Sequence, residues 1–115
     1  MPKGYAVFTL DVHDQARLFE YIEAATPSIL EAGGNVLVAG APERVLEGKW
    51  HGNRTAILEF PTVEAAQRWY HCAEYQAVIG MRHEAAESNA MIVAGFELPT
   101  EQSDEAGEQL SRAVS

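Results

Sequence analysis

The sequence predicts an α+β fold of the ferredoxin-like type, with the element order β-α-β-β-α-β and a four-stranded antiparallel sheet. Two observations carry this prediction: four segments are rich in β-forming residues, and two regions repeat apolar residues at helical spacing. A third is size, because 115 residues are most simply one domain. In this arrangement both helices cover the same face of the sheet.

The four strands are predicted from β-forming segments bounded by turn residues. They are GYAVFTLDV (4–12), NVLVAG (35–40), RTAILEF (54–60) and NAMIVAGFEL (89–98). The second strand can continue into ERVLEGKW (43–50) past a bulge near Pro42. The segment HGN (51–53) then forms the turn that leads into the third strand.

The first helix is predicted to start after Asp14, whose carboxylate can cap it, and to end at Gly33-Gly34. Pro27 predicts a kink or an irregular turn within it. Its apolar face repeats at spacings of four, three and four residues, through Leu18, Ile22, Ala25 and Ile29.

The second helical region is expected in two parts, VEAAQRWYHC (63–72) and EYQAVIGMRHEAAE (74–87). We expect the folded domain to span residues 1–98. Residues 99–115 are polar and acidic, and we expect them to form a flexible tail; the alternative is a frayed helix in EQLSRAV.

The charge of the chain limits its partners. The net charge is −9, from 17 acidic and 8 basic residues, which argues against nucleic acid and against an anionic membrane surface. RTAILEF also lacks the aromatic signature of RNA-recognition motifs. No apolar run reaches the ~20 residues of a membrane helix, and no signal peptide is recognised. With a single cysteine, these features predict a cytoplasmic protein.

Both faces of the predicted sheet carry apolar residues. In the first strand Ala6, Phe8 and Leu10 share one face, and Tyr5, Val7 and Thr9 share the other. Helices can cover only one of these faces, and a solvated face would alternate more cleanly with polar residues. We therefore expect a homodimer whose open sheet faces pack together; the alternative is a monomer with a tolerably apolar surface.

Metal and cofactor motifs are lacking in the sequence. His13, His51, His71 and His83 form no H-x-H or H-x-x-x-H pair, and no Cys-x-x-Cys, G-x-G-x-x-G or Walker loop occurs. Neighbouring His71 and Cys72 would diverge by about 100° on a helix and cannot form a nucleophile–base pair. We expect Cys72 to be a small residue at a helix junction; the alternative is a reactive thiol.

Two charged residues stand among apolar ones. Glu59 falls on the strand face with Thr55 and Ile57, where a carboxylate needs partners or a raised pKa. Arg82 falls on an apolar helical stripe. Strict alternation puts Glu59 and Arg82 on opposite sides of the sheet, so they could meet only at a bulge or an edge. Glu59 could equally form a structural ion pair or reach water.

Several segments resemble a known bacterial family, the domain of unknown function 1330 in the dimeric α/β barrel superfamily. The matching segments are GYAVFTLDVHD, AATPSILEAGGNVLVAG, VLEGKW, ILEFPTVEAAQRWYHCAEYQ, MR and IVAGF, between residues 4 and 96. Two departures concern Cys72-Ala73, where the family pattern has Ser-Pro, and Ala39, where an arginine commonly ends the second strand. If that arginine serves an acidic ligand, the ligand preference here differs.

The resemblance implies a ferredoxin-like protomer, a face-to-face dimer and a small-molecule cavity between sheet and helices, with no established activity and no cofactor. By analogy with the superfamily, one alternative is a cofactor-independent monooxygenase or isomerase that acts on an aromatic or lactone metabolite. A second is a non-catalytic metabolite-binding or stress-associated protein. A third is a heme-degrading protein that uses His71 or His83. We expect Glu59 and Arg82 to be the catalytic candidates. The expected ligand contacts are Tyr5, Phe8, Trp69, Tyr70, Tyr75 and His83, although aromatic residues on helices more often fill the core.

Overall fold

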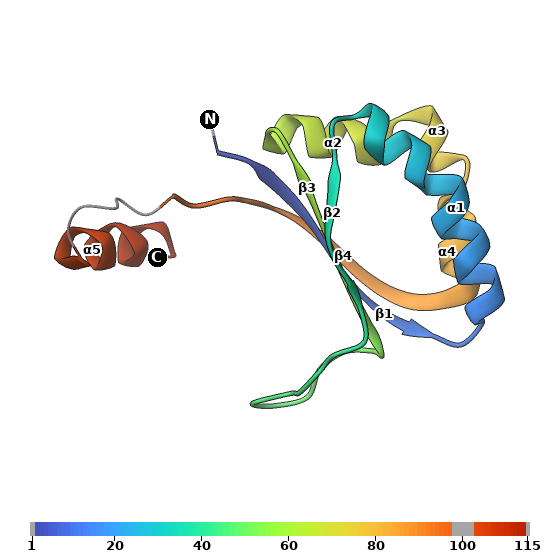
Figure 1. Cartoon of the computed structure of the whole chain (residues 1–115), viewed down its shortest axis with the longest axis horizontal. Helices are drawn as coiled ribbons and strands as arrows, with labels where there is room; N and C mark the ends of the chain where they lie inside the picture. Colours follow the sequence, from blue (N-terminus) through green and yellow to red (C-terminus); the bar gives the residue numbers. More distant parts are fainter. Residues whose placement is uncertain (1, 98–102, 115) are drawn as a thin grey trace.

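The protein folds around one sheet of four antiparallel strands in the order β2-β3-β1-β4 (Figure 1). The structure is a computed structural model that describes residues 2–97 and 103–114. The strands are β1 (Gly4–Val12), β2 (Asn35–Gly40), β3 (Arg54–Phe60) and β4 (Ala86–Ala94). This order and the intervening helices confirm the predicted ferredoxin-like α+β fold.

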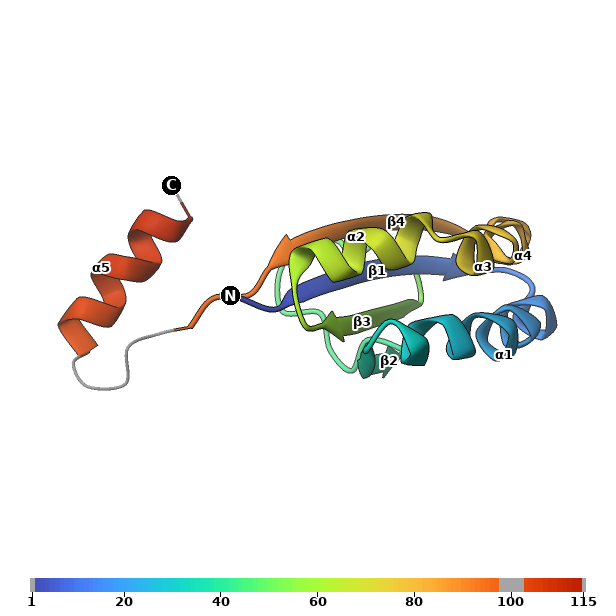
Figure 2. The ribbon, with the colours of Figure 1, turned by 90° about the horizontal axis from the view of Figure 1, so that it is seen from above.

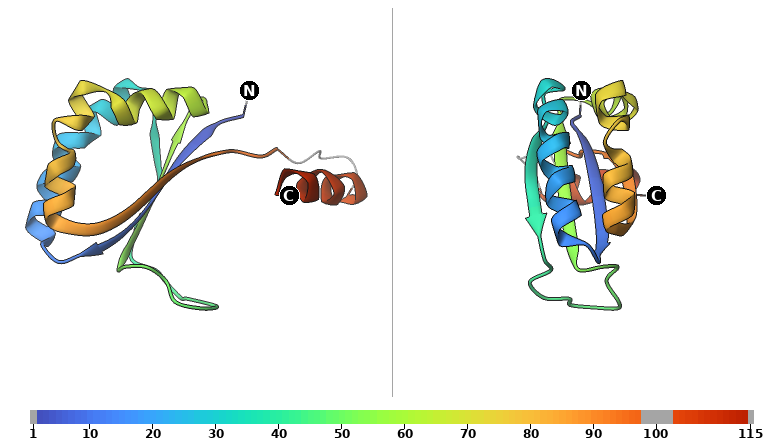
Figure 3. Two further views of the ribbon diagram at one scale, coloured as in Figure 1. Left: turned by 180° about the vertical axis from the view of Figure 1, so that it is seen from behind. Right: turned by 90° about the vertical axis from the view of Figure 1, so that its right-hand side faces the viewer.

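Four helices lie on one face of the sheet, and the other face carries none of the described helices (Figures 1 and 3). The helices on the covered face are α1 (Gln15–Glu31), α2 (Val63–His71), α3 (Ala73–Gln76) and α4 (Ile79–Ala85). Figure 2 shows α1 on the β2 side of the sheet and α2 on the β4 side. A further helix, α5 (Ser103–Ala113), lies apart from the sheet. None of the described helices is long and apolar enough to cross a membrane.

Helix α1 begins and ends as the sequence predicts. The Asp14 side chain accepts a hydrogen bond from the Arg17 amide at 3.0 Å. At the other end Gly33 adopts a φ of 81°, and the Gly34 amide donates to the Ile29 carbonyl at 2.8 Å. Pro27 does not divide the helix, which continues through it to Glu31.

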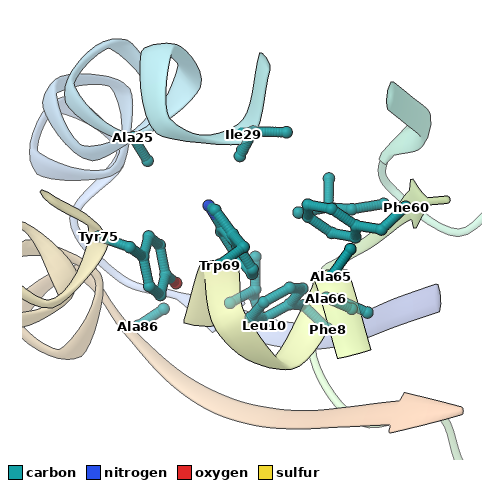
Figure 4. Close-up of a cluster of buried hydrophobic side chains, with 12 residues drawn as sticks. Phe8, Leu10, Ala25, Ile29, Phe60, Ala65, Ala66, Trp69, Tyr75 and Ala86 are labelled. Atoms are coloured by element: carbon teal, nitrogen blue, oxygen red, sulfur yellow. The ribbon is translucent and has the colours of Figure 1, made fainter. Parts of the chain in front are cut away.

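The core lies between the covered face of the sheet and the helices (Figure 4). Trp69 of α2 is at its centre, with 1% of its surface exposed. Its ring centroid lies 5.2 Å from that of Phe60 and 4.1 Å from that of Tyr75. Its indole N–H donates to the Ser28 hydroxyl at 3.1 Å, which satisfies the one polar group of this side chain.

Three predicted elements differ in the structure. Residues 43–50 do not extend the second strand, and the register irregularity lies between Val36 and Val38 instead of near Pro42. The predicted helix 74–87 divides into α3 and α4 around Ala77 and Val78. The last strand is predicted at 89–98 but runs from Ala86 to Ala94, and pairing with β1 extends its start through residues of low β propensity.

Candidate functional site

A cavity of about 140 Å³ lies between α1 and the sheet. An apolar cavity of about 150 Å³ can hold a benzene ring, so this space suits one ring or a short branched chain. Two of its lining residues, Ile22 of α1 and Val36 of β2, are 45% and 52% exposed. Sixteen residues line it: Phe8, Leu10, Leu18, Tyr21, Ile22, Ala25, Thr26, Ile29, Val36, Ala39, Gly40, Arg54, Thr55, Ala56, Leu58 and Arg82.

Arg82 brings a positive charge into this apolar cavity. The residue is 3% exposed, and its Cζ lies 5.1 Å from the ring centroid of Phe8 and 6.0 Å from that of Tyr21. The Nε atom of Arg82 is buried and has no hydrogen-bond partner within the described residues. The predicted apolar stripe of the second helical region therefore does carry a buried arginine.

No carboxylate of the described residues forms an ion pair with Arg82. A guanidinium does not lose its proton in proteins, so this side chain remains a buried cation. Burial on its own would lower the pKa of Arg82, but the Tyr75 and Tyr21 hydroxyls beside it raise that pKa overall. The two hydroxyls offset the cost of burial but carry no charge, so an anionic ligand would supply the counterion that Arg82 lacks.

Tyr21, which lines the cavity, forms a hydroxyl pair with the buried Tyr75 behind it. Their oxygens are 2.7 Å apart, and their rings meet edge to face with centroids 6.2 Å apart. Burial, with the neighbouring Tyr75, raises the pKa of Tyr21 far above its ordinary value. The Tyr21 hydroxyl therefore stays protonated near neutral pH and can donate a hydrogen bond, but it is a poor base.

Glu59 lies on the opposite, helix-free face of the sheet. Its carboxylate accepts hydrogen bonds from the Lys3 ammonium at 3.3 Å and from the Tyr5 hydroxyl at 3.1 Å. Partial burial on its own would raise the pKa of Glu59, but the hydrogen bonds from Lys3 and Tyr5 outweigh it and lower the pKa. Side chains alternate along β3, so Glu59 lies on the face of the sheet away from Arg82. Tyr5, its partner on β1, lies on that same face.

The other predicted ligand contacts fall in different places. Phe8 lines the cavity, and Tyr75 is fully buried beside Tyr21. Trp69 lies in the core and borders a separate, open groove between α1 and α2, whose rim carries the charged residues Glu31, Arg68 and Glu74. Tyr70 is half-buried, and His83 is exposed on α4.

Of the sixteen lining residues only Phe8 and Arg82 belong to the predicted site, and the missing ones include the polar residues Tyr21 and Arg54. Tyr21 follows Leu18 by three positions, so the helical spacing of α1 already puts it on the buried face. Arg54 alternates with Ala56 and Leu58 on the helix-facing side of β3. Both positions follow from periodicity, but an arginine that starts a strand is usually interpreted as reaching solvent.

The segment around Cys72 is a helix junction, as predicted. The Cys72 thiol caps α3 by accepting a hydrogen bond from the Tyr75 amide at 3.4 Å, and His71 is exposed at the end of α2. Neither residue lines the cavity. Within residues 2–97 and 103–114, no group of three or more potential metal-ligating side chains is found.

Solved structures with the same fold include two proteins of unknown function. One is from Rhodopseudomonas palustris, with 18% sequence identity, a TM-score of 0.69 and coverage of 84% of each chain. The other, from Jannaschia sp. CCS1, is described as a dimeric ferredoxin-like protein and has 12% identity and a TM-score of 0.66 over 79% of this chain and 97% of that one.

A third similar structure is SnoaB, a cofactor-independent oxygenase from Streptomyces nogalater. It has 10% identity and a TM-score of 0.58 over 88% of this chain and 100% of that one. At these identities the similarity establishes the fold alone. No curated protein sequence matches the chain at a significant level. Residues 3–96 match the family described as domain of unknown function DUF1330.

Proposed function

Because the chain belongs to the DUF1330 family of unknown function, we propose its function from the cavity: it binds a small organic acid there, as a homodimer. The observation that carries this proposal is Arg82, a buried guanidinium with an unpartnered Nε at an otherwise apolar cavity. A carboxylate supplies the counter-charge that Arg82 lacks and an acceptor for its Nε, and charge-assisted hydrogen bonds of this kind are among the stronger ones in proteins.

The ligand that fits best has one carboxylate and a compact apolar body. Leu10, Leu18, Ala25 and Leu58 offer only van der Waals contact, and the volume of about 140 Å³ suits a single ring. The Tyr21 hydroxyl can donate a second hydrogen bond to the carboxylate. An aromatic carboxylate of the size of benzoate meets these requirements.

The residues that line the cavity favour binding over proton-transfer catalysis. All sixteen belong to the described part of the chain, and none is an aspartate, a glutamate or a histidine. Glu59, the predicted acid–base candidate, lies on the other face of the sheet with Lys3 and Tyr5. A general base must come within hydrogen-bond reach of the proton it removes, and no lining side chain fills that role well.

The test is isothermal titration calorimetry with benzoate, and with benzyl alcohol as a neutral ligand of similar shape. We expect saturable binding of benzoate, at least ~10-fold weaker binding of benzyl alcohol, and loss of the benzoate preference in Arg82→Met. Arg44→Met is the matched control, because Arg44 is exposed in the β2–β3 connection and does not line the cavity. Equal binding of benzoate to wild type and Arg82→Met would contradict the proposal.

We also propose that the helix-free face of the sheet is the homodimer interface. Its apolar residues include Val38, Met91 and Val93, which are 43%, 57% and 45% exposed. A contiguous apolar surface of this kind is typical of an interface, and a second copy supplies the same surface.

We further propose a cytoplasmic location, in line with a single cysteine that can form no intrachain disulfide.

The second candidate is a cofactor-independent oxygenase, supported by the fold shared with SnoaB and by Arg82, which could stabilise an enolate. Since no carboxylate or imidazole lines the cavity, the substrate itself would need an acidic proton. Oxygen uptake with hydroxylated aromatic acids and lactones tests it. Oxygen uptake by wild type that is lost in Arg82→Met would support this candidate. If wild type takes up no oxygen, ligand binding is the remaining proposal.

A further inference from the structure

Arg54 is a second arginine of the cavity, placed where β3 begins. It lies on the helix-facing side of β3 opposite Leu10, and it borders the cavity beside Ala39 and Ala56. Its side chain is half-buried, and no ion pair to it is found among the described residues. The cavity therefore has one buried cation, Arg82, and a second at the start of β3.

The backbone that carries Arg54 is firmly held. The preceding residue, Asn53, donates from its amide to the Leu10 carbonyl at 2.8 Å. Its side chain also accepts from the Val12 amide at 2.9 Å and donates to the Val12 carbonyl at 3.1 Å. These three hydrogen bonds fix the start of β3 against β1, so the position of Arg54 relative to the cavity is set before a ligand arrives.

We infer that the ligand is a dianion, with one acidic group at Arg82 and a second at Arg54. This inference rests on the proposed function, and it assigns Arg54 as the residue that selects for two acidic groups. Arg82 lies over Phe8, which pairs with Ala56, two residues along β3 from Arg54. Both arginines line the same cavity of about 140 Å³, so a ligand held there lies beside both cations.

A cavity of this size suits a dicarboxylate built on one ring or on a short chain, with the apolar body between the two acids. The composition of the protein gives the second cation particular weight. The chain carries 17 acidic and 8 basic residues, so its overall field repels anions. Two arginines at one cavity reverse that field locally.

The experiment compares benzoate with isophthalate and terephthalate by calorimetry, in wild type, Arg54→Gln and Arg44→Gln. We expect the better of the two dicarboxylates to bind wild type at least ~10-fold more tightly than benzoate. Arg54→Gln should abolish that preference, so that neither dicarboxylate binds more tightly than benzoate does. The control Arg44→Gln should keep the preference, because Arg44 lies outside the cavity.

The outcomes separate this inference from the proposed function. If benzoate binds through Arg82 and neither dicarboxylate is preferred, the dianion inference is wrong and the proposed function stands. A preference that persists in Arg54→Gln also overturns it, because another cation would then hold the second acid. If no aromatic acid binds the wild-type protein, both are wrong. Native mass and circular dichroism of each variant establish that it is folded.

Discussion

The guanidinium of Arg82 lies over the ring of Phe8, with its Cζ 5.1 Å from the ring centroid. This contact joins α4 to β1 at the inner end of the cavity. A cation–π contact of this kind contributes about 0.5–2 kcal/mol, whereas a buried donor without a partner costs about 1–3 kcal/mol. In the free protein the two effects are of similar size and oppose each other, so they largely cancel.

Arg82→Met is therefore expected to leave the free protein as stable as wild type, within about 1 kcal/mol, or more stable. Methionine keeps the unbranched apolar stem and removes the buried charge. Urea denaturation in the absence of ligand measures the free energy of unfolding. A loss of about 3 kcal/mol or more would mean that Arg82 is a structural residue, and that its place at the cavity reflects packing instead of ligand binding.

The helix-free sheet face can be tested by charge insertion. Light scattering of the wild type should give twice the chain mass of 12.6 kDa. The double variant Met91→Glu and Val93→Glu puts like charges on that face and should give the monomer mass at micromolar concentration. Ala24→Glu with Gln15→Glu adds similar charge to exposed positions of α1 and should remain dimeric. A wild-type monomer, or a dimer in both double variants, would contradict the proposed interface.

Glu59 predicts a specific pH dependence of stability. Its pKa is lowered in the folded state, so its stabilising effect is fully present above the unfolded value of about 4.3. The effect is lost as the pH falls through the lowered folded-state pKa. Glu59→Gln should therefore show a shallower loss of unfolding free energy between about pH 5.5 and 3 than wild type does.

The control for Glu59 is Glu23→Gln, since Glu23 is exposed on α1 and forms no ion pair among the described residues. Urea denaturation over the same pH range should give this variant the acid response of wild type. If Glu59→Gln and wild type respond alike to acid, the contacts with Lys3 and Tyr5 do not lower the pKa of Glu59 in the dissolved protein.

Two glycines of the β2–β3 connection should respond differently to alanine. Gly48 and Gly52 have φ angles of 69° and 82°, so alanine is strained at both and costs about 1–2 kcal/mol. At Gly48 an added Cβ meets open space, whereas at Gly52 it would clash with the Leu10 carbonyl. Gly52→Ala should cost about 3 kcal/mol in total and should also weaken ligand binding, because it disturbs the start of β3 beside Arg54.

Thermal and urea unfolding of the two glycine variants measure this difference. Equal destabilisation would show that the backbone of the connection moves away from Leu10 without cost. The comparison also tests the inference on Arg54, since the Asn53 hydrogen bonds to Leu10 and Val12 adjoin Gly52.

The sequence predicts the first three strands with their correct ends, because alternation and turn residues agree there. The last strand is the difficult one. Ala86, Glu87, Ser88 and Asn89 have low β propensity, and only the pairing of residues such as Ser88 with Leu10 makes them a strand. The break between α3 and α4 is missed for a related reason, since no proline or glycine marks Ala77 and Val78.

The site is predictable in part. The burial of Arg82 follows from its place on an apolar helical stripe, and the separation of Glu59 from Arg82 follows from strand alternation. Local patterns do not reveal that α1 leaves a cavity above β2 and β3, because this depends on how a helix sits on a sheet. For the same reason Tyr21 and Arg54 become site residues only in three dimensions.

The most direct test of organic-acid binding is nuclear magnetic resonance of the Arg82 Nε–H group in ¹⁵N-labelled protein. The resonance can be assigned by its loss in Arg82→Lys. The structure predicts that this signal shifts in a saturable way as benzoate or a dicarboxylate is added, because the unpartnered Nε gains an acceptor. An Arg82 signal that stays unchanged while the acid binds elsewhere would contradict the account.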